Sequence, residues 1–144
     1  KEMARVLKPG GRIATSVWSV PERNFWATAI MSIIHKNMDL PQPPPSAPGL
    51  FRCGKEGFMD DLFKQAGLHA ILSQELTGKL KCDTIDEYWS FMNEVAAPVV
   101  AAMGKADDTL KAKIKAEVFE LVRSKNPDGK AALAYGSIVT YGEK

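Results

Sequence analysis

The side chains that could do chemistry in this sequence do not fall into a familiar catalytic set. The histidines, His35 and His69, have no carboxylate or nucleophile at catalytic spacing, and a surface or packing role is expected for each. The cysteines, Cys53 and Cys82, match neither a zinc-ligand spacing nor a disulfide framework. No Ser-His-Asp set, metal cluster or phosphate-binding loop can be assembled. The sequence therefore predicts no catalytic and no metal-ligating residue.

The bulk composition is that of an ordinary globular protein. The chain has 144 residues, of which 45% are hydrophobic and 25% charged, and this length fits a single domain spanning residues 1–144. A net charge of +2 gives no electrostatic case for a nucleic-acid partner. No apolar run approaches the ~20 residues of a membrane span, so no membrane partner is expected. Unpaired thiols suit a reducing, cytoplasmic location.

The first elements to be positioned are a helix end and a strand. Residues 2–7 favour a helix that Pro9 stops, and Gly10 and Gly11 allow a tight turn. Arg12–Trp18 is short and mostly apolar, which predicts a strand covered on both faces, as in a parallel sheet. This strand looks like a central one, although no strand precedes it in the sequence.

A helix is predicted next, from a cap at Ser19 to a point near Asp39. Glu22 would complete a capping box with Ser19, and Pro21 would lie in the first turn. The proline-rich stretch Pro41–Gly49 must be extended. It could be a domain linker or a surface loop, and we favour the loop because the segments on both sides look too small to fold alone.

The remaining segments alternate in the same way. A third helix is predicted over 55–67, where Gly67 is the stop, and a strand over His69–Cys82, where Gly78 is a possible bulge. A helix opens at a Thr84 and Glu87 capping box and is ended or kinked by Pro98. Another helix starts near residue 107, and a last strand covers 132–144. Strands that alternate with helices predict an α/β fold.

Several segments, in this order, resemble class I S-adenosylmethionine-dependent methyltransferases of the ubiquinone-biosynthesis type, also called methyltransferase type 11 relatives. The most diagnostic is "RVLKPGG", Arg5–Gly11, inside the opening "KEMARVLKPGGRIATSVW". It is followed by "WSVPERNFW" from Trp18, "LFRCGKEGFMDDLFKQAGL" from Leu50 and the closing "IVTYGEK" from Ile138. The resemblance covers nearly all of this chain but only the back half of the family fold.

The resemblance implies a partial Rossmann-like methyltransferase fold. The three strands would be strands five, six and seven of the family sheet, with seven antiparallel between five and six, and about four to five helices would surround them. The Gly-rich loop and the acidic ribose-binding residue of the family are missing. The cofactor-binding half should then precede Lys1, and this truncated domain should hold no S-adenosylmethionine and no cofactor-binding residue.

The resemblance also implies where a small-molecule methyl acceptor would bind. Ligands of open α/β sheets lie beyond the carboxyl ends of the strands, and methyl transfer depends mostly on positioning. The candidate substrate-binding residues are Trp18, Ser19, Arg23, Phe25 and Trp26. Each has a plainer alternative. The aromatic side chains could simply be core, Arg23 a solvated helix residue and Ser19 a helix cap.

Three interpretations of the whole chain follow. It can be the acceptor-side, C-terminal portion of a methyltransferase that is inactive alone. Alternatively, it can be a stand-alone binding or dimerisation module derived from such an enzyme. An internal-type strand without its neighbour would expose an edge, so a homodimer through Arg12–Trp18 is then expected. A third interpretation is a fragment left by proteolysis. The acceptor and the atom methylated are not specified by the sequence.

Overall fold

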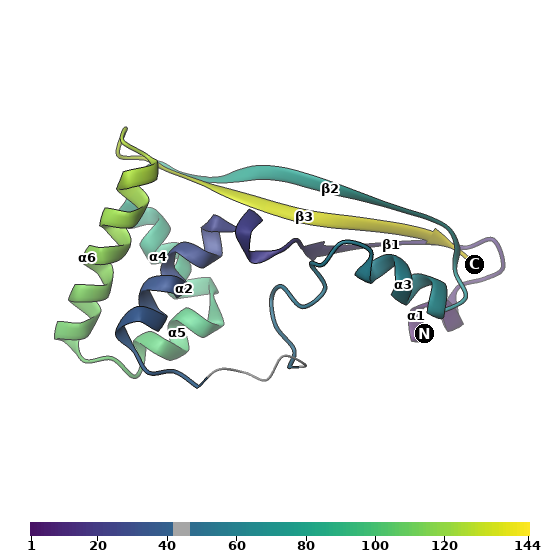
Figure 1. The fold of residues 1–144 in the computed structure, drawn as a ribbon, viewed down its shortest axis with the longest axis horizontal. Coiled ribbons are helices and arrows are strands. Elements are labelled where there is room, and N and C mark those ends of the chain that lie inside the picture. The colour runs from purple at the N-terminus through teal and green to yellow at the C-terminus, as the bar shows by residue number, and fades with distance from the viewer. Residues whose placement is uncertain (42–46) are drawn as a thin grey trace. The chain divides into compact units, whose positions relative to one another are not determined.

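The computed structural model describes residues 1–41 and 47–144, and it opens as expected with a short helix and a strand (Figure 1). Helix α1 spans Glu2–Val6 and strand β1 spans Arg12–Trp18. Gly10 has a φ of 73°, a left-handed conformation that favours glycine at this turn. Part of the expected loop Pro41–Gly49 lies outside the described residues.

The segment after β1 differs from the expected continuous helix. A 3-10 turn, η1, covers Pro21–Arg23, and helix α2 covers Phe25–Asn37. The prediction of a Ser19 cap was wrong, because the Ser19 hydroxyl donates to Glu75 Oε1 at 2.8 Å instead of capping a helix. The break occurs because the Asn24 side-chain amide donates to the carbonyls of Ser19 and Val20.

The next helix and strand are as predicted. Helix α3 spans Phe58–Gln65, and Gly67, at a φ of 79°, follows its end. Strand β2 spans His69–Cys82. A Cβ on Gly78 would lie 2.5 Å from Tyr135 Cζ, so the glycine lets the tyrosine ring pack directly on the strand.

Three helices and the last strand complete the chain. Helix α4 spans Ile85–Val95, α5 spans Ala97–Met103, α6 spans Asp108–Lys125 and β3 spans Ala131–Glu143. Thr84 and Asp107 cap α4 and α6 by accepting the backbone N–H three residues on, at 3.0 and 2.7 Å.

The described part of the chain holds six α-helices, one more than expected. The extra one is α5, because Pro98 lies in its first turn, where a missing N–H is harmless. Among these described helices, none is both long and apolar enough to cross a membrane.

The strands form a sheet in the order β1-β3-β2, so the fold is α/β as predicted. β1 and β3 are antiparallel, with Thr15 opposite Thr140. The Ser73 and Thr140 hydroxyls are 2.6 Å apart and Gly78 meets Tyr135, so β2 also runs antiparallel to β3. The last strand therefore lies between two mutually parallel strands, which is the order and direction that the family resemblance implies.

The expectation that β1 is covered on both faces was wrong. Its side chains alternate, with Arg12, Ala14 and Ser16 exposed and the residues between them partly buried. On the covered face, Ile13 packs with Phe63 of α3. Helices cover only one face of β1, so every second side chain of the strand is on the exposed face.

The chain divides into two compact units. The first contains Lys1–Asn24, the described part of 44–78 and Tyr135–Lys144; the second contains the described part of 25–43 and Lys79–Ala134. Strands β2 and β3 each contribute residues to both. The core of the first unit includes Ala4, Phe63 and Leu68. The single-domain expectation stays a prediction.

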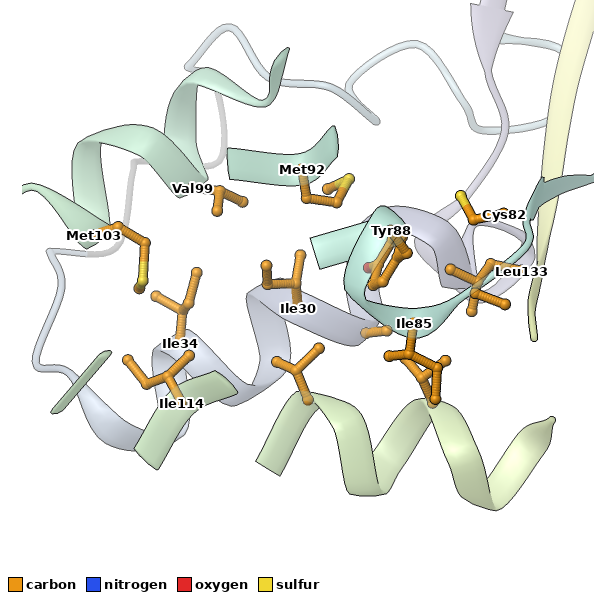
Figure 2. Close-up of a cluster of buried hydrophobic side chains, with 14 of the residues drawn as sticks. Ile30, Ile34, Cys82, Ile85, Tyr88, Met92, Val99, Met103, Ile114 and Leu133 are labelled. Atoms are coloured by element: carbon orange, nitrogen blue, oxygen red, sulfur yellow. The ribbon is translucent and has the colours of Figure 1, made fainter. Parts of the chain in front are cut away.

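The second unit has the larger core, shown in Figure 2. Ile30 and Ile34 of α2 and Ile114 of α6 are fully buried in it. The Tyr88 hydroxyl donates to the Trp26 carbonyl at 2.7 Å, and burial raises the pKa of that phenol. Lys36 on α2 also donates to Glu117 on α6 at 2.9 Å, which lowers the pKa of the Glu117 carboxyl.

Candidate functional site

The end of β1 opens onto a polar hollow inside the first unit. It has a volume of about 590 Å³. Its polar residues come from the turn after β1, from α3 and the segment just before it, and from β2: Ser19, Arg23, Glu56, Asp60, Ser73, Gln74 and Glu75. We call this hollow the Glu75 pocket. It is the place where a residue run predicted for ligand binding meets side chains from distant parts of the sequence.

Asn24 builds the rim of the Glu75 pocket. Its side chain is fully buried and its Nδ2 donates to the carbonyls of Ser19 and Val20 at 3.1 and 3.0 Å. Its Oδ1 accepts the Gly136 backbone N–H at 3.2 Å, so the turn is fixed to the middle strand. A buried amide with both ends satisfied holds one conformation, because each lost bond would leave a buried polar group unpaired.

Gly136 leaves the space in which the pocket residues converge. A Cβ there would lie 3.0 Å from Arg23 Cβ, 3.2 Å from Glu75 Oε1 and 3.4 Å from Ser19 Cβ. Ser19 is only 4% exposed, and its hydroxyl is committed to Glu75. The Glu75 side chain is exposed, and its carboxylate lies beside the Arg23 stem, where it can accept a further hydrogen bond from a ligand.

Hydrogen bonds between Thr140, Ser73 and Asp60 connect the sheet to α3. The Ser73 hydroxyl donates to Asp60 Oδ1 and is 2.6 Å from the Thr140 hydroxyl. Thr140 is fully buried, so this polar link crosses the covered face of the sheet. Asp60 also lines the Glu75 pocket.

The five predicted substrate-binding residues do not lie in one place. Ser19 and Arg23 line the Glu75 pocket. Trp18 lines a different hollow with Leu50 and Cys53, and its ring meets Tyr135 edge-on at a centroid distance of 6.1 Å. Phe25 and Trp26 belong to the second unit and pack, partly buried, against its core. Their role in binding a substrate stays a prediction.

Sequence reasoning missed Asn24, Asp60, Ser73 and Glu75. One signal was available, because Ser73 and Glu75 share a strand face with Ile71, which packs into the core. Polar residues on the inward face of a strand break the expected pattern and often mark a functional position. For Asn24 the sequence carried no such signal, since it stands inside a run that reads as helix.

The glycine turn before β1 has no free amides for a cofactor. The Gly10 N–H donates to the Lys144 carbonyl at 2.7 Å, and the Gly11 N–H donates to the Lys8 carbonyl at 2.8 Å. Because both donors are used within the chain, this turn does not fit S-adenosylmethionine. Among the described residues, no group of three or more His, Cys, Asp or Glu side chains is arranged to hold a metal ion.

Among the described residues of the first unit, two side chains have shifted pKa values, and they lie at the other end of β1. The Tyr141 hydroxyl donates to Glu143, which raises the pKa of the phenol and lowers that of the carboxyl. Arg12 also contacts Glu143, at 2.9 Å. These groups tie the first residue of β1 to the last of β3 and do not line the Glu75 pocket.

Comparison with known proteins yields little. No protein-family model matches the chain, and no curated protein does. Among solved structures, a protein from Bacillus halodurans C-125 that carries a provisional methyltransferase assignment aligns at 17% identity and a TM-score of 0.43. The alignment covers 99% of this chain and 60% of that one, so this chain spans less than two thirds of its length. A likeness this low assigns no activity.

Proposed function

We propose that the chain is the C-terminal, acceptor-side portion of a class I S-adenosylmethionine-dependent methyltransferase of the ubiquinone-biosynthesis type that acts on a small molecule. The observation that carries the proposal is the sheet order, with β3 antiparallel between two mutually parallel strands. It supports the strand assignment implied by the "RVLKPGG" motif and its successors. In this proposal the cofactor-binding half lies outside this chain, and a cytoplasmic location follows from the enzyme class.

The acceptor in this proposal contacts the turn that follows β1. Ser19 and the exposed Glu75 form a hydrogen-bonded pair that lines the pocket, and Arg23 supplies a positive group beside them. Trp18 lines a separate hollow, and Phe25 and Trp26 pack against the core of the second unit, so these three predicted residues are not assigned to this pocket. Ser19, Glu75 and Arg23 position the acceptor.

A titration of the 144-residue chain with S-adenosylmethionine tests whether cofactor binding needs the half of the fold that lies outside this chain. We expect no heat of binding in calorimetry, because the described glycine turn has no free amides and the family's Gly-rich loop is missing from the sequence. Micromolar binding would contradict it. The matching positive arm uses the chain extended by whatever its gene encodes before Lys1. That extended chain should bind the cofactor, and failure to bind, or no coding sequence there, would overturn the proposal.

A second candidate function is a stand-alone dimerisation module derived from such an enzyme. The observation that favours it is that β1, which the sequence pattern presents as an internal strand, is at the edge of the described sheet. An edge strand presents backbone donors and acceptors to any further strand.

A further inference from the structure

Strand β1 has an outer edge that can pair with another strand, and its geometry decides which residues do so. Ser19 N–H donates to Gly136 O, and Lys144 N–H donates to Gly11 O. In the antiparallel register, the odd-numbered residues of β1 therefore bond to β3. The N–H and C=O groups of the even-numbered residues, Arg12, Ala14 and Ser16, point to the outer edge.

The edge is closed at its carboxyl end. A Cβ on Gly54 would be 2.7 Å from the Trp18 carbonyl oxygen and 2.6 Å from the Ser19 carbonyl carbon. The backbone at Gly54 therefore lies against the end of β1 and blocks an added strand there. The edge available for pairing is Arg12–Ser16, which is shorter than the whole strand.

The rest of this edge has few of the features that usually prevent pairing. Within Arg12–Ser16 it has no lysine, no proline and no residue with a positive φ, and its one charged side chain is that of Arg12 at the start. The outer strand on the far side, β2, differs, because it carries exposed Lys79 and Lys81 and a kink at Ala70, whose φ is 47°. Pairing is therefore expected at β1 and not at β2.

We propose that two copies of this chain pair through their β1 edges, antiparallel about a two-fold axis at Ala14. This register places Arg12 of each copy opposite Ser16 of the other and Ala14 opposite Ala14, so every outward-pointing residue of the open edge is used. No like charges face each other, and the central pair is small. The inference rests on the second candidate function and deepens it by naming the register.

The chain enters β1 through Gly10, whose N–H donates to the Lys144 carbonyl just after β3. In the proposed register this turn of one copy comes next to Trp18 of the other, where Gly54 closes the edge. A register centred on Thr15 would instead require Arg12 to pair with Trp18 at the blocked position.

Light scattering of the full chain tests the dimer. We expect a dimer whose population grows with concentration, and a monomer at all concentrations overturns both the register and the second candidate function.

Ala14→Pro should yield a folded monomer, because it removes an outward N–H that the sheet does not use. The matched control is Leu72→Lys, at a side chain that is 68% exposed on β2. It should remain a dimer, and a monomer here would overturn the edge interface.

Disulfide cross-linking tests the register separately, in a Cys53→Ser background. Ala14→Cys should cross-link under mild oxidation, because opposed residues of an antiparallel pair bring their Cα atoms to about 5.5 Å, within disulfide range. Ser16→Cys should not, since its thiol would face Arg12. A dimer in which Ser16→Cys or Thr15→Cys cross-links and Ala14→Cys does not would overturn the register and leave the second candidate function standing.

Discussion

At the scale of single residues, Asn24 decides the geometry of the candidate site. It separates η1 from α2, and its side-chain hydrogen bonds to Ser19, Val20 and Gly136 tie the turn after β1 to the middle strand. The sequence pattern predicted that Ser19 would cap a helix here. In the structure, the Asn24 side chain holds this turn instead. The Ser19 hydroxyl donates to Glu75, while Asn24 binds the carbonyls of the turn.

Asn24→Ala should lower the free energy of unfolding by about 2–4 kcal/mol, because it removes the side-chain partner of the buried Ser19 carbonyl and of the buried Gly136 N–H. Urea denaturation followed by circular dichroism measures the change. Asn93→Ala is the matched control, since its side chain is half-buried and donates to the Trp89 carbonyl within one helix at 2.8 Å. A loss below about 1 kcal/mol for the control is expected, and equal losses would contradict the role given to Asn24.

At the scale of elements, the order of the strands and the segment at Gly54 matter most. The segment before α3 packs its backbone against the end of β1, which closes that end of the edge and forms part of the pocket wall. Only a residue without a side chain allows this contact, because a Cβ would meet backbone atoms that cannot rotate away.

Gly54→Ala should destabilise the chain by about 1–3 kcal/mol, the usual cost of overpacking. Because the clash is with the Trp18 and Ser19 carbonyls, the variant should also shift the amide signals of β1 in a nitrogen–proton correlation spectrum. Gly49→Ala is the matched control, since its added Cβ meets no described atom within 4 Å. A Gly54→Ala variant as stable as Gly49→Ala would show that the contact is absent in solution.

At the scale of the whole molecule, two hydrophobic cores occur in one chain. The larger contains Ile114 and belongs to the second unit; the smaller contains Phe63 and belongs to the first. They share none of the buried residues that define them, although β2 and β3 run through both units. Local stability can therefore differ between the units even though the same strands enter each.

Ile114→Ala should test this independence. Removing a fully buried isoleucine costs roughly 2–5 kcal/mol, and the loss should fall on the unit that contains it. Hydrogen exchange should show faster exchange for amides of α2 and α6 and unchanged exchange for those of β1 and α3. A uniform loss of protection over both units would show that they unfold together.

The sequence by itself determined most elements and their order. The limits of β1 follow from an apolar run after a Pro-Gly-Gly stop, the limits of β2 were predicted correctly, and the cap at Thr84 follows from local side-chain chemistry. Such features depend on neighbours within a few residues, so a pattern can reveal them. The resemblance then implied the strand order, which the sheet confirms.

Only the tertiary structure decided which side chains meet. Glu75 and Ser19 are 56 positions apart, and Gly136 and Asn24 are 112 apart. Their pairing depends on how β2 and β3 are registered against the turn after β1. No local pattern encodes that register, because each of these residues has an ordinary local explanation. The prediction that β1 is covered on both faces was wrong for the same reason. Distant segments, and not the strand itself, decide which of its faces is covered.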